Sequence, residues 1–165
     1  MNTSAKRLAR LAILTALAAV LLFLCSVLPT GRLGFMVIAS FPIALALMQY
    51  GIGWSAAVYA ITAVLSALLF MSDAVLGFIL FFGYYPIVKS LFERIRFLVG
   101  EWAAKYAVYT AAFVLCALFA SSLWEGLAWP VWVLWLAGAA VFFVYDRCYT
   151  AAISVYINKL ARYLP

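Results

Sequence analysis

The residues that could do chemistry are few in this chain, and their types exclude most catalytic arrangements. Histidine is absent, so the chain lacks the side chain that most often acts as a general base near neutral pH. The three cysteines, Cys25, Cys116 and Cys148, form no Cys-x-x-Cys pair, and two of them lie inside apolar runs. Buried thiols behave as small hydrophobic groups. We therefore expect neither a cysteine or serine nucleophile paired with histidine nor a metal site.

The acidic residues are equally sparse, and all of them avoid the apolar runs. They fall at turns, loops or helix ends, at Asp73, Glu93, Glu101, Glu125 and Asp146. General acid–base catalysis needs positioned groups that face one pocket, and no such pair can be identified here. A Gly-x-x-x-x-Gly-Lys-[Ser/Thr] loop for nucleotide phosphates is also missing. We expect a protein that is not an enzyme and has no catalytic residue and no cofactor.

The composition of the chain indicates which kind of secondary structure holds these residues. Of the 165 residues, 70% are hydrophobic and only 10% are charged, whereas a soluble domain is about 45–50% apolar. A membrane-spanning helix needs about 20 mainly apolar residues. The sequence predicts an all-α polytopic membrane protein in which six transmembrane helices form one bundle. We expect these helices at about 8–28, 34–50, 54–71, 74–88, 101–120 and 131–147, in a single domain over 1–165 with an amphipathic, helical tail at 148–165.

Local signals refine these elements. Pro42 lies inside the second helix, and Gly51-Ile52-Gly53 predicts a tight turn after it. Asp73 stands where it could cap the fourth helix, and Tyr84-Tyr85-Pro86 predicts a kink near that helix's end. Charged residues alternate with apolar ones from Lys89 to Lys105, which favours a helix that leaves the membrane or lies along its surface.

The basic residues predict the orientation. If the N-terminus is cytoplasmic, ten of the eleven Lys and Arg residues lie inside and only Arg32 lies outside. This asymmetry is the one that the positive-inside rule describes. We expect both termini to be cytoplasmic in a bacterial-type plasma membrane. The net charge of +6 suits contact with anionic membrane lipid, at about 1 kcal/mol per basic residue, and no nucleic acid is expected as a partner.

Two groups of residues are candidates for binding. The first helix carries small residues at Ala9, Ala12, Ala16 and Ala19, preceded by Ala5, and this spacing lets another helix approach closely. That helix could belong to a partner or to this chain. At the external end, Arg32, Trp124, Glu125 and Trp129 could bind a small organic molecule together with Asp73, or they could be an interfacial aromatic belt with scattered charges.

Several spans also contain polar side chains. These are Tyr59, Thr62, Ser66, Tyr109 and Thr110. Inside a membrane such groups more often form hydrogen bonds between helices than contacts to a ligand. We interpret them in that way.

Three stretches carry a resemblance to a known family. They are the alanine-spaced first helix from Lys6 to Ala19, Phe41-Pro42-Ile43-Ala44, and the junction from Tyr50 to Ala57. Over about the first 75 residues the chain resembles the substrate-binding S components of energy-coupling-factor vitamin transporters. The expected six helices and cytoplasmic termini agree with that architecture.

The resemblance implies a function and partners. It implies a membrane-embedded subunit that captures a small organic micronutrient at the external face of an ATP-driven importer. Such a subunit has a transmembrane coupling subunit and two ATPases as partners, and the alanine face of the first helix would meet the coupling subunit. The alternative is a non-transporting membrane scaffold that organises a cell-envelope protein complex. Its working surfaces would be the segment from Lys89 to Lys105 and the tail.

Overall fold

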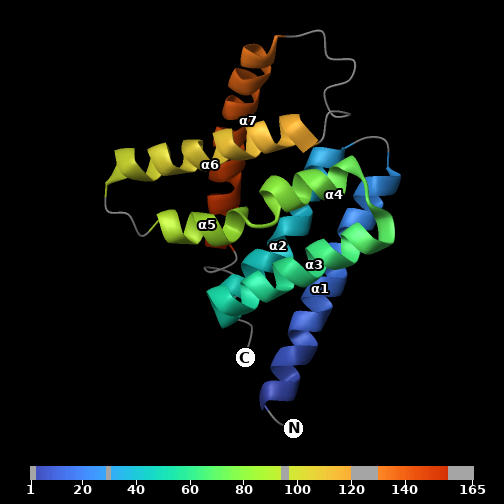
Figure 1. Ribbon diagram of the computed structural model, residues 1–165. Helices are drawn as coiled ribbons and strands as arrows, with labels where there is room; N and C mark the ends of the chain where they lie inside the picture. Colours follow the sequence, from blue (N-terminus) through green and yellow to red (C-terminus); the bar gives the residue numbers. More distant parts are fainter. Residues whose placement is uncertain (1–2, 29–30, 94–96, 120–129, 156–165) are drawn as a thin grey trace. The chain divides into compact units, whose positions relative to one another are not determined.

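The computed structural model describes residues 3–28, 31–93, 97–119 and 130–155, and its elements are all helices in that part of the chain (Figure 1). The all-α class expected from the sequence is therefore confirmed. The helices are α1 (Thr3–Val27), α2 (Arg32–Tyr50), α3 (Ile52–Phe70), α4 (Asp73–Gly77), the π-helix η1 (Phe78–Phe82), α5 (Tyr85–Phe92), α6 (Leu98–Phe119) and α7 (Val131–Val155).

Five segments within the described residues are long and apolar enough to cross a membrane. They are Ser4–Val27, Arg32–Tyr50, Ile52–Phe70, Asp73–Phe92 and Val131–Val155. These segments support a multi-pass membrane protein. The helix expected at 101–120 is present as α6, which begins three residues earlier, but it is not one of the five. The count of six spans therefore stays a prediction.

The chain forms two compact units, residues 1–125 and residues 126–165. In the first unit α1, α2 and α3 pack on one another, and the segment from α4 to α5 packs against them, as Figure 1 shows. In the second unit α7 continues past the expected end at residue 147, so the start of the expected tail is helical to Val155. The rest of that tail lies outside the described residues.

Glycine and proline set the connections, as the sequence predicts. Gly51 alone separates α2 from α3, with φ of 85°, a left-handed region that favours glycine. The turn is thus shorter than the expected Gly51–Gly53. Pro42 lies within α2, as expected. The cap of α4 differs from the prediction, because Ser72 is the N-cap residue and its hydroxyl accepts from the N–H of Val75, while Asp73 begins the helix.

The fourth span is not a uniform helix. The N–H of Gly83 donates to the carbonyl of Phe78 at 2.7 Å, a π-helical bond that spans five residues. A turn at Gly83 and Tyr84 follows, and α5 begins with Pro86 in its first turn. The kink expected at Tyr84-Tyr85-Pro86 is confirmed as this break in the span.

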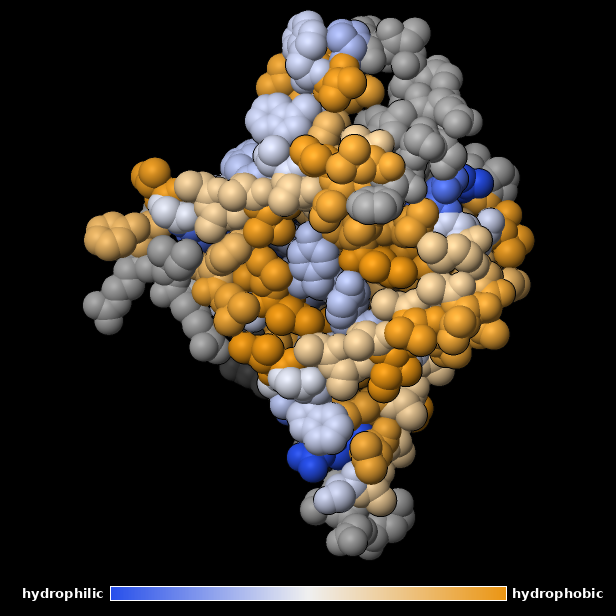
Figure 2. All heavy atoms as spheres, viewed as in Figure 1, coloured by the Kyte–Doolittle hydropathy of each residue, from blue (hydrophilic) through white to orange (hydrophobic). Residues whose placement is uncertain are grey.

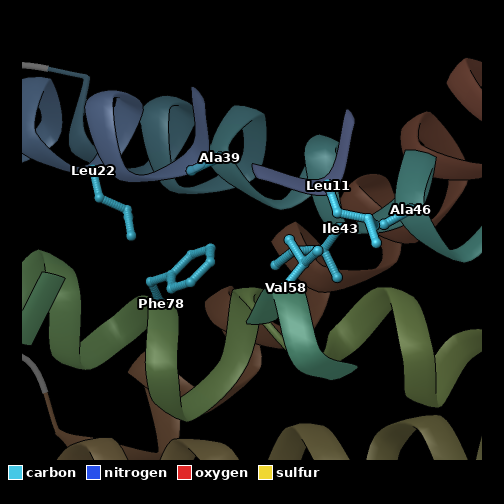
Figure 3. Close-up of a cluster of buried hydrophobic side chains, with 7 residues drawn as sticks. All are labelled: Leu11, Leu22, Ala39, Ile43, Ala46, Val58 and Phe78. Atoms are coloured by element: carbon cyan, nitrogen blue, oxygen red, sulfur yellow. The ribbon is translucent and has the colours of Figure 1, made fainter. Parts of the chain in front are cut away.

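The core lies where α1, α2, α3 and η1 meet. Figure 3 shows its seven buried side chains, which are Leu11, Leu22, Ala39, Ile43, Ala46, Val58 and Phe78. Leu11, Ile43 and Val58 converge from three helices at one end of the cluster, and Leu22 and Phe78 face each other at the other. Leu11 of α1 and Val58 of α3 lie at the same end of the cluster (Figure 3), and Ser26 near the end of α1 contacts Ser72, which follows α3. The two helices therefore run in the same direction.

The outward surface of the helices is apolar. Leu68 is 80% exposed and Ile13 is 66% exposed, and Figure 2 shows hydrophobic residues over much of α3 and α4. Hydrophilic residues gather near the N-terminal end of α1 in the same view. Exposing such leucines and isoleucines to water would be unfavourable by about 25 cal/mol per Å², so lipid is the expected surrounding of these faces.

Candidate functional site

The end of the first unit that carries Arg32 contains a small polar cluster. The thiol of Cys25 donates to the carbonyl of Arg32 at 3.2 Å. The hydroxyls of Ser26 and Ser72 lie 2.8 Å apart, which ties the end of α1 to the start of α4. Arg32 itself is exposed at the first position of α2. Because Trp124, Glu125 and Trp129 lie outside the described residues, the expected grouping of these four side chains stays a prediction.

The alanines of α1 do not share one environment. Ala9, Ala12 and Ala16 are exposed, whereas Ala19 is 7% exposed and belongs to the packed side of the helix. Leu11, Thr15, Ala18, Leu22 and Cys25 form that packed side. The face with Ala9, Ala12 and Ala16 is therefore left uncovered when α1 packs on α2 and α3.

The inward face of α3 is polar along its length. Ser55, Tyr59, Thr62 and Ser66 are spaced by four, three and four residues, so they lie on one face of the helix. Ser55 donates to the carbonyl of Ile43 on α2 at 3.0 Å. This bond is the kind of interhelical contact that we expected from the polar side chains of the spans.

Tyr59 forms a second interhelical bond of this type. Its hydroxyl donates to the carbonyl of Ile79 in η1 at 2.8 Å. Ile79 lies in the π-helix, where the hydrogen-bonding pattern of an α-helix is interrupted. The Tyr59 ring also packs against Phe78 and Tyr84, with ring centroids 6.4 Å away in each case. The interhelical interpretation is thus confirmed for Tyr59.

Thr62 and Ser66 depart from that interpretation. Both residues are fully buried, and neither hydroxyl has a hydrogen-bond partner in the described part of the chain. Other hydroxyls bond to carbonyls of their own helix: Thr15 to Leu11 at 2.9 Å, Ser26 to Leu22 at 3.0 Å and Thr110 to Tyr106 at 2.8 Å. The prediction of an interhelical hydrogen bond is therefore wrong for Thr62, Ser66 and Thr110. Only the first two are left without any partner.

Aromatic side chains fill the region where η1, α5 and α6 meet. Phe81 packs against Tyr85 at 5.6 Å and against Tyr109 at 6.3 Å between ring centroids. Tyr109 also contacts Tyr106 and Phe113 on its own helix. The sequence placed Tyr109 among the polar residues of the spans, and the structure adds that its ring joins α6 to η1.

One lysine of α5 and one of α6 are each paired with a nearby glutamate. Lys89 lies 3.0 Å from Glu93, and Lys105 lies 2.6 Å from Glu101, in both cases one turn apart. Both lysines are 2% exposed. At the N-terminal end of α1, the Arg7 guanidinium stacks over the Trp54 ring of α3, 4.9 Å from its centroid. In the described ranges no three Cys, Asp or Glu residues gather closely enough to hold a metal ion.

Comparison of the chain with protein-family models, with curated proteins and with solved structures found no match.

Proposed function

We propose that this chain is the membrane-embedded substrate-binding subunit of an ATP-driven micronutrient importer, similar to the S components that its first helices resemble. In this proposal it captures a small organic molecule at the external face. It contains no ATPase motif of its own, so a transmembrane coupling subunit and two ATPases supply the energy. The six spans, with both termini in the cytoplasm of a bacterial-type cell, are part of the same proposal.

The observation that carries the proposal is the uncovered alanine face of α1. Ala9, Ala12 and Ala16 are exposed although α1 packs on two other helices. Small residues at this spacing let two helix backbones approach closely, and van der Waals contact is a main source of helix association in lipid. In this proposal a helix of the coupling subunit packs against this face and covers it. Arg32, Trp124, Glu125 and Trp129 remain the proposed substrate contacts at the external end.

The scaffold alternative receives less support from the described residues. It would use the basic segment from Lys89 to Lys105 as a docking surface, and both of these lysines are buried and paired with glutamates one turn away. The charge of each lysine is therefore already paired with a glutamate of this chain. This favours an importer subunit over a scaffold that binds partners through these two side chains.

The test is co-purification with a matched control. Ala12→Leu together with Ala16→Leu fills the groove of the uncovered face, and we expect at least a tenfold loss of the coupling subunit and ATPases recovered by gentle extraction from native membranes. Ala56 and Ala60 form the control, because they are an exposed alanine pair with the same spacing on α3. Their replacement by leucine should leave recovery unchanged. Recovery of cell-envelope synthesis proteins without an ATPase would instead support the scaffold.

A further inference from the structure

The N-terminal end of α1 carries three positive charges close together on the helix surface. Lys6 and Arg7 stand four and three residues before Arg10, so each of them is a neighbour of Arg10 on the helix. Lys6 and Arg10 are exposed, and Arg7 is half-buried. None of the three forms an ion pair within the described part of the chain. Like charges at these spacings repel each other, and a bound anion would remove that repulsion.

Arg7 is held in place by an aromatic ring. Its guanidinium lies over the ring of Trp54 in the first turn of α3, 4.9 Å from the ring centroid. The stack uses the flat face of the guanidinium, whereas the N–H donors lie in its plane. Its Nε has no hydrogen-bond partner among the described residues. Arg7 therefore places a fixed positive charge beside Arg10, and the stack that fixes it uses none of its hydrogen bonds.

This end of α1 reaches the lipid headgroups. The spanning segment Ser4–Val27 has 24 residues, which is about 36 Å of helix, whereas the hydrocarbon layer is about 30 Å thick. The three basic residues lie in the first two turns of this segment, and Figure 2 shows hydrophilic residues gathered at this end. Trp54 is also of the residue type that is enriched in the headgroup layer. The cations therefore stand at the depth of the lipid phosphates.

A row of exposed leucines continues from the charges along α1. Leu17 and Leu24 follow Arg10 at intervals of seven residues, a spacing that returns to nearly the same side of a helix. Leu17 is 48% exposed and Leu24 is 38% exposed. Ala9 and Ala16 each precede a member of this row by one residue, which is a rotation of about 100° around the helix. The row and the alanine face are therefore different sides of α1.

We propose that Lys6, Arg7 and Arg10 bind the phosphate of one anionic phospholipid, whose acyl chains lie along the exposed leucines of α1. A cation above an apolar row is complementary to a molecule with a negative head and a hydrocarbon tail. A lipid without net charge carries a positive group of its own beside the phosphate, and the three cations repel that group. The site does not depend on the proposed function, because the lipid and a helix on the alanine face contact different sides of α1.

The test measures lipid binding to the purified full chain. Native mass spectrometry in mild detergent counts bound lipids while phosphatidylglycerol, which is anionic, or phosphatidylcholine, which has no net charge, is added. We expect one phosphatidylglycerol per chain to bind about tenfold more tightly than phosphatidylcholine, or better. Arg10→Gln should weaken phosphatidylglycerol binding by about fivefold. Arg32→Gln is the matched control, because Arg32 is also an exposed arginine on a helix of the first unit, and it should leave this affinity unchanged.

Equal affinity of the unsubstituted chain for the two lipids would overturn the proposal. So would equal losses in Arg10→Gln and Arg32→Gln, because net charge alone would then explain the binding. Excess inorganic phosphate should not displace the lipid, and displacement would show a phosphate site that does not use the leucine row. Lys6→Gln repeats the measurement at the second exposed cation, and circular dichroism checks that each variant is folded. Recovery of the coupling subunit is a separate measurement, so this proposal can fail while the proposed function stands.

Discussion

At the scale of single residues, Gly83 permits the close contact between α3 and the fourth span. A Cβ atom at this position would lie 2.6 Å from the Tyr59 ring and 2.9 Å from the Phe78 ring. The Tyr59 ring cannot move away freely, because its hydroxyl is bonded to Ile79. We expect Gly83→Ala to reduce stability by about 1–3 kcal/mol, the usual cost of overpacking. Thermal unfolding of the purified protein in detergent measures this change.

Gly34→Ala is the control for this prediction. Gly34 lies in α2, and a Cβ there would meet nothing within 4 Å. Alanine should therefore be neutral or stabilising by up to about 1 kcal/mol. An unfolding midpoint for Gly83→Ala that matches that of Gly34→Ala would contradict the packing of Tyr59 against Gly83.

The sequence shows which side chains are polar, but it does not show which atoms they contact. The sequence identified Tyr59 as a polar residue of a span, but its acceptor depends on the π-helix at Phe78–Phe82, which no apolar pattern reveals. The cap of α4 is a similar case. Ser72 and Asp73 are both favourable N-cap residues, so a shift of one residue in the helix start decides between them.

At the scale of elements, the connection between α2 and α3 depends on one residue. Gly51 has φ of 85° and ψ of −179°, a conformation that other residues adopt only with strain of about 1–3 kcal/mol. We expect Gly51→Ala to lower the free energy of unfolding by that amount. It should also weaken the packing of the α2–α3 pair, which can be followed by limited proteolysis at the turn together with thermal unfolding.

Gly53→Ala provides the comparison, only two residues away. Gly53 is helical, and a Cβ there would meet nothing within 4 Å, so alanine should stabilise α3 by up to about 1 kcal/mol. The two variants should therefore change stability in opposite directions. A stabilising effect of Gly51→Ala would be inconsistent with the left-handed backbone at the turn.

The extents of the elements show what an apolar pattern can predict. The expected ends of the first three spans lie within five residues of the observed ends, because helix-breaking residues stand at the ends of the apolar runs there. It placed a boundary at 147 between the last span and a helical tail, whereas α7 runs without a break to Val155. Asp146 and Arg147 mark the end of an apolar run but do not end a helix. Hydropathy predicts where a helix meets lipid, whereas backbone hydrogen bonding decides where it stops.

At the scale of the whole molecule, the proposed sites were only partly predictable. The spacing of Ala9, Ala12 and Ala16 identified a close-packing face, and the structure leaves that face uncovered. The same spacing included Ala19, which packs inside the unit, because spacing alone does not say where neighbouring helices lie. The unpartnered hydroxyls of Thr62 and Ser66 could not be predicted at all. Their types indicated hydrogen bonds, and only the packing of the surrounding helices leaves those bonds unformed.

The topology of the whole chain depends on α6. Five spans would place the two termini on opposite sides of the membrane, whereas a sixth span formed by α6 would place both on the same side. Glu101 and Lys105 lie in the first part of α6, but the helix carries no charge from Tyr106 to Leu118. The distribution of Lys and Arg favours cytoplasmic termini. We therefore expect α6 to cross the membrane.

Reporter fusions in a bacterial host decide between the two counts. Green fluorescent protein should fluoresce at either terminus, and alkaline phosphatase fused to the C-terminus should be inactive, because each reporter works on only one side of the membrane. A phosphatase fusion after Met71, in the turn between α3 and α4, is the positive control and should be active. Active phosphatase at the C-terminus, with a fluorescent N-terminus, would reduce the bundle to five spans. The basic residues of α7 and the tail would then lie outside, against the positive-inside rule.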